Sequence, residues 1–433
     1  MKIQSNNSSD RSSVYARVFA NRDFRSLWFG QICSQFAFNT LLFVLALRVY
    51  QTTGSNTAVS GLFLAHGIPA VLFGLIAGTA VDRLDKRRVL IYCDIFRAIS
   101  TFGLLFTSNQ IIVVYLITFI NSIITQFYVP SEAPLIPKLM HKDLIVTANS
   151  LFSLTFFSSL AIGTIVSGPL LRIFGPDGGF MFITLLFALS AYFVYQIPSQ
   201  SEGTIGIRYI SSLRPAHMLS RMWHDLREGI TYIRSSATLF DSILLLTGTQ
   251  IIFALLGALG PGFADRILTI DVRDASLLIV GPTVLGILAG VVWVGAVGYK
   301  IKSKALITTG VLGAGSTLIC IAVVARLMHM PQFSFLTLYN SGFIIEVILF
   351  FLLGLSNSLL DVPSNASLQT LAIGEMRGRV YGMLTTFVGG VGILPIILGG
   401  FLADTIGVGK VIFALGVSIA LFGVYRVRYS TVA

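Results

Sequence analysis

Residues Gly78–Arg88, which read GTAVDRLDKRR, decide the fold class of this chain. They form a short burst of charge between two long apolar runs, residues 57–81 and 89–108. Crossing a bilayer takes about 20 predominantly apolar residues, so each run is long enough to span one. The charged connection is too short for a folded domain, and Lys and Arg clusters of this kind stay on the cytoplasmic side. The segment therefore predicts a tight cytoplasmic turn between two membrane helices.

The composition of the 433 residues indicates an integral membrane protein. Hydrophobic residues make up 55% and charged residues only 11%, whereas soluble domains carry about 25% charged residues. The net charge of +11 is concentrated at the ends of the apolar runs, which favours a role in membrane topology over nucleic-acid binding. Cys33, Cys93 and Cys320 lie within apolar runs at no ligand spacing, so no disulfide framework, metal or cofactor is expected.

Twelve apolar runs are long enough to cross a membrane, which predicts an all-α integral membrane protein with 12 transmembrane helices. The runs are residues 27–47, 57–81, 89–108, 110–130, 144–171, 178–197, 240–262, 277–299, 304–325, 339–361, 380–403 and 409–427. Most Lys and Arg residues fall on the side that holds both termini. The positive-inside rule therefore places both termini in the cytoplasm of a plasma (inner) membrane protein. Residues 1–26 are predicted to be a cytosolic tail and interfacial segment.

The two halves of the chain repeat one another. Residues 129–135 read VPSEAPL and residues 362–368 read VPSNASL, each at the inner end of the fourth predicted helix of its half. Parallel repeats of this kind describe transporters built from two bundles related by an axis along the membrane normal. We therefore predict two pseudo-symmetric six-helix bundles, residues 27–198 and 240–433. Residues 199–239 join them through an amphipathic helix on the inner leaflet, or alternatively as a plain solvated linker.

The charged turn resembles the loop 2–3 signature of the major facilitator superfamily, G-x-x-x-D-R-x-G-R-[KR]. The residues in register are Gly78, Asp82, Arg83, Lys86 and Arg87, while Asp85 replaces the second glycine. Residues 21–28 before the first span and 377–380 before the eleventh resemble the branch of enterobactin-exporter-like and macrolide-efflux-like proteins. The resemblance extends over nearly the whole chain and implies the fold of that superfamily.

In the resembling family this loop acts as a conformational latch that holds the cytoplasmic side closed. The resemblance implies that Asp82 reaches the N-terminus of the eleventh helix near Arg379 and that Arg83 pairs with Glu132. The alternative is a positive-inside anchor only, although an anchor has no need for Asp82. The complete set of predicted latch residues is Gly78, Asp82, Arg83, Lys86, Arg87, Glu132 and Arg379.

Charged residues inside predicted spans are candidates for proton coupling, because burying a charge in a bilayer costs several kcal/mol. Asp94 and Arg97 lie three residues apart and can pair on one helix face, as a structural ion pair or as a proton relay. Glu346 is the most isolated carboxylate, and it either takes up a proton or faces the outer water layer. Asp361 lies near the inner end of the same span. The acid in span one and arginine in span four of many family antiporters are absent, so the coupling ion is a proton or another ion.

Span five contains Gly163, Gly168 and Pro169, which resemble the exporter-type Gly-Pro motif, although small residues also serve simple close packing. A substrate pocket is expected between the halves near the midplane. Its polar and aromatic candidates, each alternatively a helix–helix hydrogen-bonding residue, are Gln35, Phe36, Asn39, Asn121, Gln126, Gln250, Phe253 and Asn357. The 33 phenylalanines and the few intramembrane charges favour a bulky amphiphilic substrate over a sugar or inorganic anion.

These features predict a monomeric secondary active transporter for proton-driven efflux of an amphiphilic small molecule, such as a drug-like compound or a siderophore. A lipid or lysolipid flippase and an uptake permease of the same fold are alternatives, and a non-transporting sensor or scaffold is a remote one. The five histidines are scattered over different segments, so no enzyme is expected. The predicted partners are the substrate, the coupling ion and the lipid bilayer, with no nucleic acid.

Overall fold

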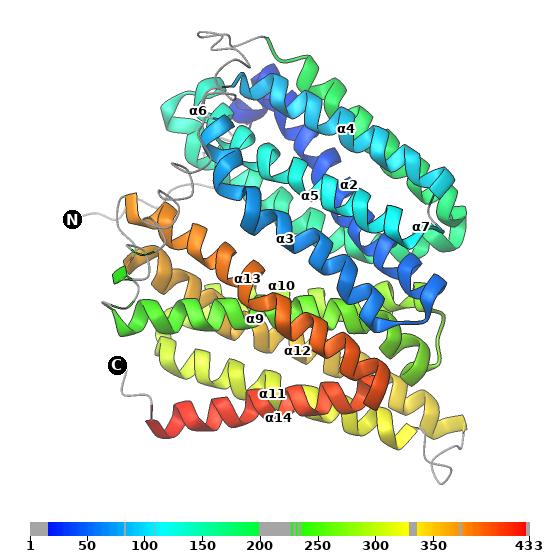
Figure 1. Ribbon diagram of the computed structural model, residues 1–433. Helices are drawn as coiled ribbons and strands as arrows, with labels where there is room; N and C mark the ends of the chain where they lie inside the picture. Colours follow the sequence, from blue (N-terminus) through cyan, green and yellow to red (C-terminus); the bar gives the residue numbers. More distant parts are fainter. Residues whose placement is uncertain are drawn as a thin grey trace, which may run out of the picture. The chain divides into compact units, whose positions relative to one another are not determined.

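The computed structural model describes residues 16–81, 84–107, 109–198, 227, 231–232, 234, 236–328, 336–371 and 375–429. Within these residues the chain forms helices and no strands (Figure 1). The long helices are α2 (Arg22–Thr53), α3 (Asn56–Val81), α4 (Lys86–Thr107), α5 (Ile111–Glu132), α7 (Ile145–Tyr195), α9 (Ala237–Phe263), α10 (Gly281–Val297), α11 (Ser303–Met328), α12 (Leu336–Leu371), α13 (Glu375–Ile406) and α14 (Val408–Tyr429). Most of the predicted amphipathic linker helix lies outside the described residues.

Ten helices of the described chain are long and apolar enough to cross a membrane, which confirms the helical membrane fold but differs from the predicted count of twelve. The difference has two sources. The 51-residue helix α7 covers the fifth and sixth predicted spans and is counted once, although its backbone breaks at Gly175 (φ 68°, ψ 179°). A straight helix of that length would measure about 75 Å, well over twice the hydrocarbon thickness. In α13 only the shorter apolar part Gly390–Ile406 qualifies.

The chain forms two compact units. Unit 1 comprises residues 1–44 and 72–215, and unit 2 comprises residues 45–71 and 216–433. The end of α2 and the beginning of α3, both from the first half of the sequence, therefore group with the second half. This grouping places the loop between α2 and α3 beside helices encoded more than 200 residues later.

In unit 1, α4 packs against both α5 and α7. The core around one end of these helices contains Phe24, Leu90, Tyr128 and Phe152, all buried. Only one face of α4 turns inward, and it carries Asp94, Arg97 and Thr101 in addition to leucines. The inward face of this helix is therefore partly polar.

In unit 2, α12 packs against α10 and α11, and α11 packs against α14. A Cβ atom at Gly286 of α10 would overlap the backbone of Phe351, and one at Gly354 of α12 would overlap the backbone of Thr283. The two helices therefore touch backbone to backbone, which is how small residues promote association of membrane helices. The Ser358 hydroxyl adds a hydrogen bond of 2.7 Å to the Ile287 carbonyl oxygen across the same contact.

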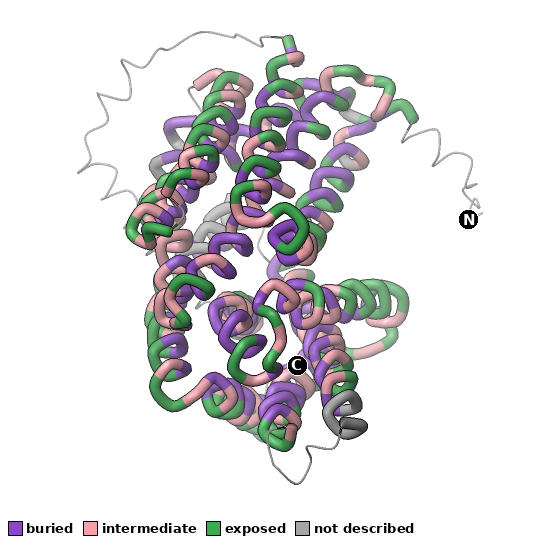
Figure 2. The backbone as a smooth tube through the Cα atoms, turned by 90° about the vertical axis from the view of Figure 1, so that its right-hand side faces the viewer, coloured by how far each residue is buried: buried purple, intermediate pink, exposed green. Residues whose placement is uncertain are grey.

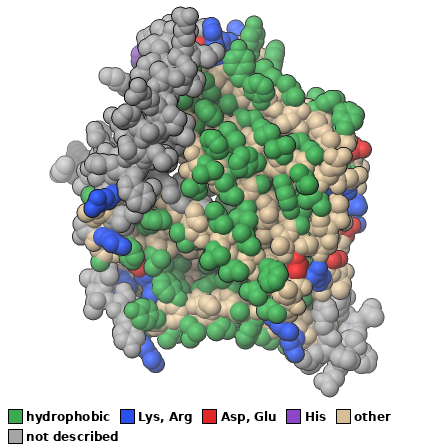
Figure 3. All heavy atoms as spheres, in the orientation of Figure 1, with side chains coloured by type: hydrophobic (Ala, Val, Ile, Leu, Met, Phe, Trp, Pro, Cys, Tyr) green, Lys and Arg blue, Asp and Glu red, His purple; other side chains and the backbone are tan. Residues whose placement is uncertain are grey.

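The outward faces of the helices are apolar. In each unit the buried residues lie on the sides where helices face one another, and the exposed residues lie on the outer sides (Figure 2). Large hydrophobic side chains on these outer sides reach exposures of 77% at Phe106 and 82% at Ile112. Hydrophobic side chains cover much of the described surface in Figure 3, and the charged ones are few. Such extensive apolar exposure is expected for surfaces that contact lipid.

Candidate functional site

A buried ion pair lies in the interior of unit 1. Asp94 and Arg97 of α4 are 0% and 2% exposed, and the Arg97 Nη1 lies 3.4 Å from the Asp94 Oδ1. The spacing of three residues places both side chains on one face of the helix, as the sequence predicted, and this face is the buried one. The carboxylate also accepts hydrogen bonds from two other helices, from the Ser34 Oγ of α2 at 2.7 Å and from the Ser190 Oγ of α7 at 2.6 Å. Both carboxylate oxygens are therefore satisfied.

The guanidinium of Arg97 is held by polar and aromatic neighbours. It donates to the Ser34 Oγ at 3.0 Å and to the Thr125 Oγ1 of α5 at 2.9 Å. Its Cζ atom lies 4.6 Å from the ring centre of Tyr128, and Phe38 and Phe187 approach it at 5.2 and 5.7 Å. Cation–π contacts are strongest when desolvated, so these rings help to keep a full positive charge inside the bundle.

Glu132, at the end of α5, is buried close to this network. It is 7% exposed, and its Oε1 accepts no hydrogen bond from the described residues. Its expected partner Arg83 lies outside the described residues, so the pairing stays a prediction. Asp94, Arg97 and Glu132 together bring three ionisable groups into the interior of one bundle.

Glu346 of α12 is the most isolated carboxylate in the described part of unit 2. It is 1% exposed, and neither carboxylate oxygen accepts a hydrogen bond of good geometry from the described residues, although the Ala325 backbone lies beside it. This burial argues against the alternative that Glu346 faces the outer water layer. Asp361 of the same helix is half-buried and accepts a hydrogen bond of 3.0 Å from the Asn365 Nδ2.

Several predicted substrate residues are engaged within their own helices. The Asn39 amide donates to the Gln35 carbonyl at 2.9 Å, and the Gln126 amide donates to the Ser122 carbonyl at 3.2 Å. The Asn121 amide binds the Ser100 hydroxyl of α4 at 3.0 Å, which is the helix–helix role named as its alternative. The remaining candidates are half-buried or exposed: Phe36 on α2, Gln250 and Phe253 on α9, and Asn357 on α12.

The glycine motif of α7 lies against α2. A Cβ atom at Gly163 would approach the Thr40 Oγ1, the Asn39 Cβ and the Phe36 carbonyl oxygen at 3.1–3.2 Å. The Thr40 hydroxyl donates to the Gly163 carbonyl at 3.2 Å. Gly168 is buried and Pro169 half-buried within α7, whose break lies further along at Gly175. These contacts explain the glycine at position 163, because a larger side chain would not fit between the closely packed helices α7 and α2.

Asp85, which departs from the family signature, has a local role. Its Oδ1 accepts hydrogen bonds from the backbone N–H groups of Arg87 at 3.0 Å and Arg88 at 3.3 Å, so it caps the N-terminus of α4. Arg87 donates to the Tyr195 carbonyl at 2.6 Å. Asp82 and Arg83 lie outside the described residues, as do the side chains near Arg379, so the latch contacts stay a prediction.

A second polar cluster, absent from the sequence-based predictions, surrounds Asp404 of α13. The Asp404 Oδ2 accepts from the Ser55 hydroxyl at 2.6 Å, the Thr57 N–H at 2.9 Å and the Thr57 hydroxyl at 2.7 Å. The Oδ1 accepts from the Asn56 N–H and the Asn56 Nδ2, each at 2.9 Å. Arg266 adds an ion pair at 3.6 Å and donates to the Gly54 carbonyl. We call these five residues the Asp404 clamp: Ser55, Asn56, Thr57, Arg266 and Asp404.

The Asp404 clamp completes the N-terminus of α3. The first N–H groups of a helix have no partner within the helix. Here Thr53 accepts from the Ser55 N–H, Ser55 accepts from the Ala58 N–H, and Asp404 accepts from the two N–H groups between them. The clamp lies at the helix ends that the charge pattern predicts to be extracellular. Nearby, the Tyr50 hydroxyl donates to Asp265 at 3.0 Å, a second contact between α2 and the segment after α9.

The described residues contain no group of His, Cys, Asp and Glu that could hold a metal ion. What they contain is buried ionic groups inside membrane helices and a polar clamp at one end of them. Buried ionisable groups of this kind mark ion and substrate pathways in membrane proteins. The buried ionic groups therefore suit an ion or substrate pathway across the membrane.

Comparisons with known proteins agree with this assignment. The sequence model of the Major Facilitator Superfamily matches residues 27–325. The chain is 27% identical to the MFS-type transporter YkuC of Bacillus subtilis over 57% of this chain and 56% of that protein. It is 24% identical to macrolide efflux protein A of Streptococcus pyogenes over 89% of this chain and 90% of that protein.

Among solved structures, a bacterial homologue of the iron transporter ferroportin in an inward-facing state superposes with a TM-score of 0.71. The identity is 15%, and the match covers 95% of this chain and 99% of that one. At this identity the likeness concerns the fold alone. The shared fold includes helices beyond residue 325, where the family model ends. The chain is a multi-pass membrane transporter of a small molecule, and it belongs to the major facilitator superfamily.

Proposed function

We propose that the protein exports an amphiphilic small molecule across the plasma membrane and couples this export to proton entry. The observation that carries the direction of transport is the similarity to a macrolide efflux protein over nine-tenths of both chains. The apolar character of the bundles supports an amphiphilic substrate. Macrolides are the first substrates to test, because the named relative exports them.

Proton coupling is supported by the buried carboxylates. Glu346 lies in the interior of unit 2 without a cation beside it among the described residues, and an uncompensated charge there costs several kcal/mol. When a conformational change moves such a carboxylate between a buried and a water-filled environment, it is expected to take up or release a proton. Asp94 differs, because two hydroxyls and Arg97 already satisfy it. We therefore assign the proton to Glu346 and a structural role to the Asp94–Arg97 pair.

Alternating access requires one side of the protein to be closed while the other is open. In this proposal the Asp404 clamp closes the extracellular side, because it ties the loop between α2 and α3 to α13 and to the segment after α9. The loop that holds Asp82 closes the cytoplasmic side in the other state. The substrate binds from the cytoplasm while the clamp is made and leaves after it opens.

The proposal is tested by transport into inside-out membrane vesicles that contain the protein. Vesicles energised to a proton gradient should accumulate a labelled macrolide or a fluorescent amphiphile faster than vesicles without the protein. Collapse of the proton gradient with a protonophore, with a sodium gradient kept intact, should abolish the difference. Continued accumulation under that condition contradicts proton coupling. Equal macrolide susceptibility and export in a deletion strain and its parent contradict efflux itself.

A further inference from the structure

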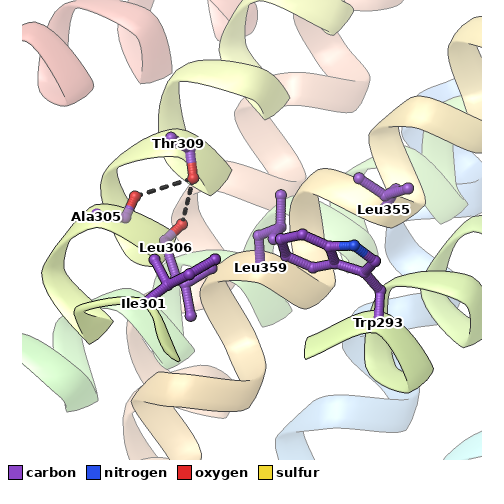
Figure 4. Close-up of a pocket in the computed structure, with 7 residues that line it drawn as sticks. All are labelled: Trp293, Ile301, Ala305, Leu306, Thr309, Leu355 and Leu359. Atoms are coloured by element: carbon purple, nitrogen blue, oxygen red, sulfur yellow. Dashed lines mark hydrogen bonds between the residues drawn. The ribbon is translucent and has the colours of Figure 1, made fainter. Parts of the chain in front are cut away.

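A shallow apolar groove lies between α10, α11 and α12 in unit 2. It has a volume of about 300 Å³ and is lined by Trp293, Ile301, Ala305, Leu306, Thr309, Leu355 and Leu359 (Figure 4). The one polar side chain in this lining, Thr309, directs its hydroxyl to the carbonyl oxygens of Ala305 and Leu306 at 2.9 Å each. The groove therefore offers hydrocarbon walls to an occupant. We call it the Trp293 groove.

The segment that lines one side of the Trp293 groove carries three lysines. Lys300 and Lys302 flank the lining residue Ile301, and Lys304 precedes the lining residue Ala305; all three lysines are exposed. No Asp or Glu occurs in the sequence between Asp274 and Glu346, so this stretch of sequence contributes cations and no acid. The combination of an apolar slot with a cationic rim complements a molecule that has a hydrocarbon chain and an anionic head.

The start of α11 strengthens this complementarity. The helix begins at Ser303, so Lys302 and Lys304 stand at its positive end, where a cation is unfavourable. The N–H groups of Ala305 and Leu306 already bond to the Lys302 carbonyl. An anion at this end would relieve the repulsion between the lysines and the helix dipole.

Trp293 indicates that the groove lies at the level of the lipid head groups. Its indole is 45% exposed on the outer side of α10, and tryptophan is enriched where the hydrocarbon meets the head groups. Basic pockets between membrane helices on the cytoplasmic side are known to suit anionic lipid heads. We propose that the Trp293 groove binds an anionic phospholipid, with one acyl chain in the groove and the phosphate among Lys300, Lys302 and Lys304.

The test uses the full-length protein in nanodiscs, with phosphatidylglycerol and phosphatidylcholine as the probes. Native mass spectrometry should show retained phosphatidylglycerol in preference to phosphatidylcholine. The triple variant Lys300→Gln, Lys302→Gln, Lys304→Gln should weaken that preference at least tenfold, since each lysine near an anionic lipid contributes about fivefold in affinity. A matched triple variant at other exposed cations, Lys138→Gln, Arg326→Gln, Lys410→Gln, should change it less than twofold.

A second variant tests the apolar part of the site separately. Ala305→Phe fills the groove and leaves all three lysines in place, so it should abolish the retained lipid. The thermal midpoint of the wild type should rise in phosphatidylglycerol relative to phosphatidylcholine, and this rise should vanish in the triple lysine variant. An unchanged lipid preference in that variant, or an equal loss in the matched control, overturns the proposal. Loss of substrate binding in Ala305→Phe with lipid retained would assign the groove to the substrate and likewise overturn it.

Discussion

Replacing Asp404 by Asn is the sharpest perturbation of the proposed cycle, because it keeps the shape of the side chain and removes its charge. The Oδ2 of Asp404 accepts three hydrogen bonds, one from Ser55 and two from Thr57. An amide NH2 group in that position accepts no hydrogen bond, and it would face the Thr57 backbone N–H donor to donor. The Oδ1 could still accept from Asn56. The substitution therefore removes the hydrogen bonds to Oδ2 and the ion pair with Arg266.

The magnitude follows from the bonds that are lost. Hydrogen bonds to a charged acceptor contribute about 1.5–3 kcal/mol each, and loss of a helix N-cap costs about 0.5–2 kcal/mol. The Asp404 side chain is 21% exposed, and its bonds are not independent, so we take about 3 kcal/mol for the whole change rather than the sum. Because 1.4 kcal/mol is a factor of ten, the ratio of the clamped to the open state should fall about 100-fold.

The assay is labelling of a buried cysteine just inside the clamp. Ser60 is 1% exposed, lies one turn further along α3 and contacts Gly400 of α13. In a background with the three native cysteines replaced by Ala, Ser60→Cys should react slowly with a membrane-impermeant maleimide added outside intact cells. Addition of Asp404→Asn should raise the labelling rate by at least tenfold and lower the initial rate of export, because fewer molecules can load substrate from the cytoplasm.

A matched control is available in the same unit. Asp271 caps its own short turn, where it accepts from the Arg273 N–H at 2.9 Å, and it contributes no bond to the clamp. Asp271→Asn removes the same charge and should leave labelling of the Ser60→Cys reporter unchanged. Wild-type labelling in Asp404→Asn, or an equal increase in Asp271→Asn, would show that the clamp does not close the extracellular side.

Three further variants test the assigned roles. Glu346→Gln should abolish gradient-driven export while substrate binding, measured by fluorescence quenching, is retained; a wild-type pH profile of transport would leave Glu346 as a packing residue only. Asp94→Asn leaves the Arg97 charge buried without its partner, which should cost about 3–5 kcal/mol and lower the thermal midpoint. The double change with Arg97→Gln should recover part of that loss, and no recovery would contradict a structural pair. Asp82→Asn should preserve insertion and substrate binding but slow export severely and expose inner-cavity cysteines; export at the wild-type rate would refute the cytoplasmic latch.

The sequence predicted the helical membrane fold well, because a span of about 20 apolar residues bounded by charge is a local signal. Element ends were less predictable. The break at Gly175 was anticipated as a gap between two spans, yet the chain continues as helix on both sides of it. Grouping of residues 45–71 with the second half could not be predicted, because it depends on contacts between segments more than 200 residues apart.

The candidate site also has features that the sequence predicts and features that it does not. The Asp94–Arg97 pair was predictable from its spacing of three residues, but its partners Ser34 and Ser190 were not. A serine in a membrane span serves equally for packing and for hydrogen bonding, so its presence carries no positional information. Asp404 stands one residue beyond a predicted span and resembles an ordinary polar end of a helix. Only the folded chain brings it to the start of α3.

The Asp404 clamp and the predicted Asp82 latch involve the same two helices in reciprocal fashion. Asp404 lies near the C-terminal end of α13 and caps the N-terminus of α3, while Asp82 follows the C-terminal end of α3 and is expected to reach the N-terminus of α13. Each contact places a carboxylate where free N–H groups and the helix dipole favour an anion. Two contacts of similar strength that exclude one another leave the two states close in energy, and a few kcal/mol then suffices to reverse their populations. The double variant Asp82→Asn, Asp404→Asn should therefore bring the labelling rate of Ser60→Cys closer to the wild type than Asp404→Asn alone. If the two contacts did not act on the same equilibrium, the double variant would be labelled as fast as Asp404→Asn.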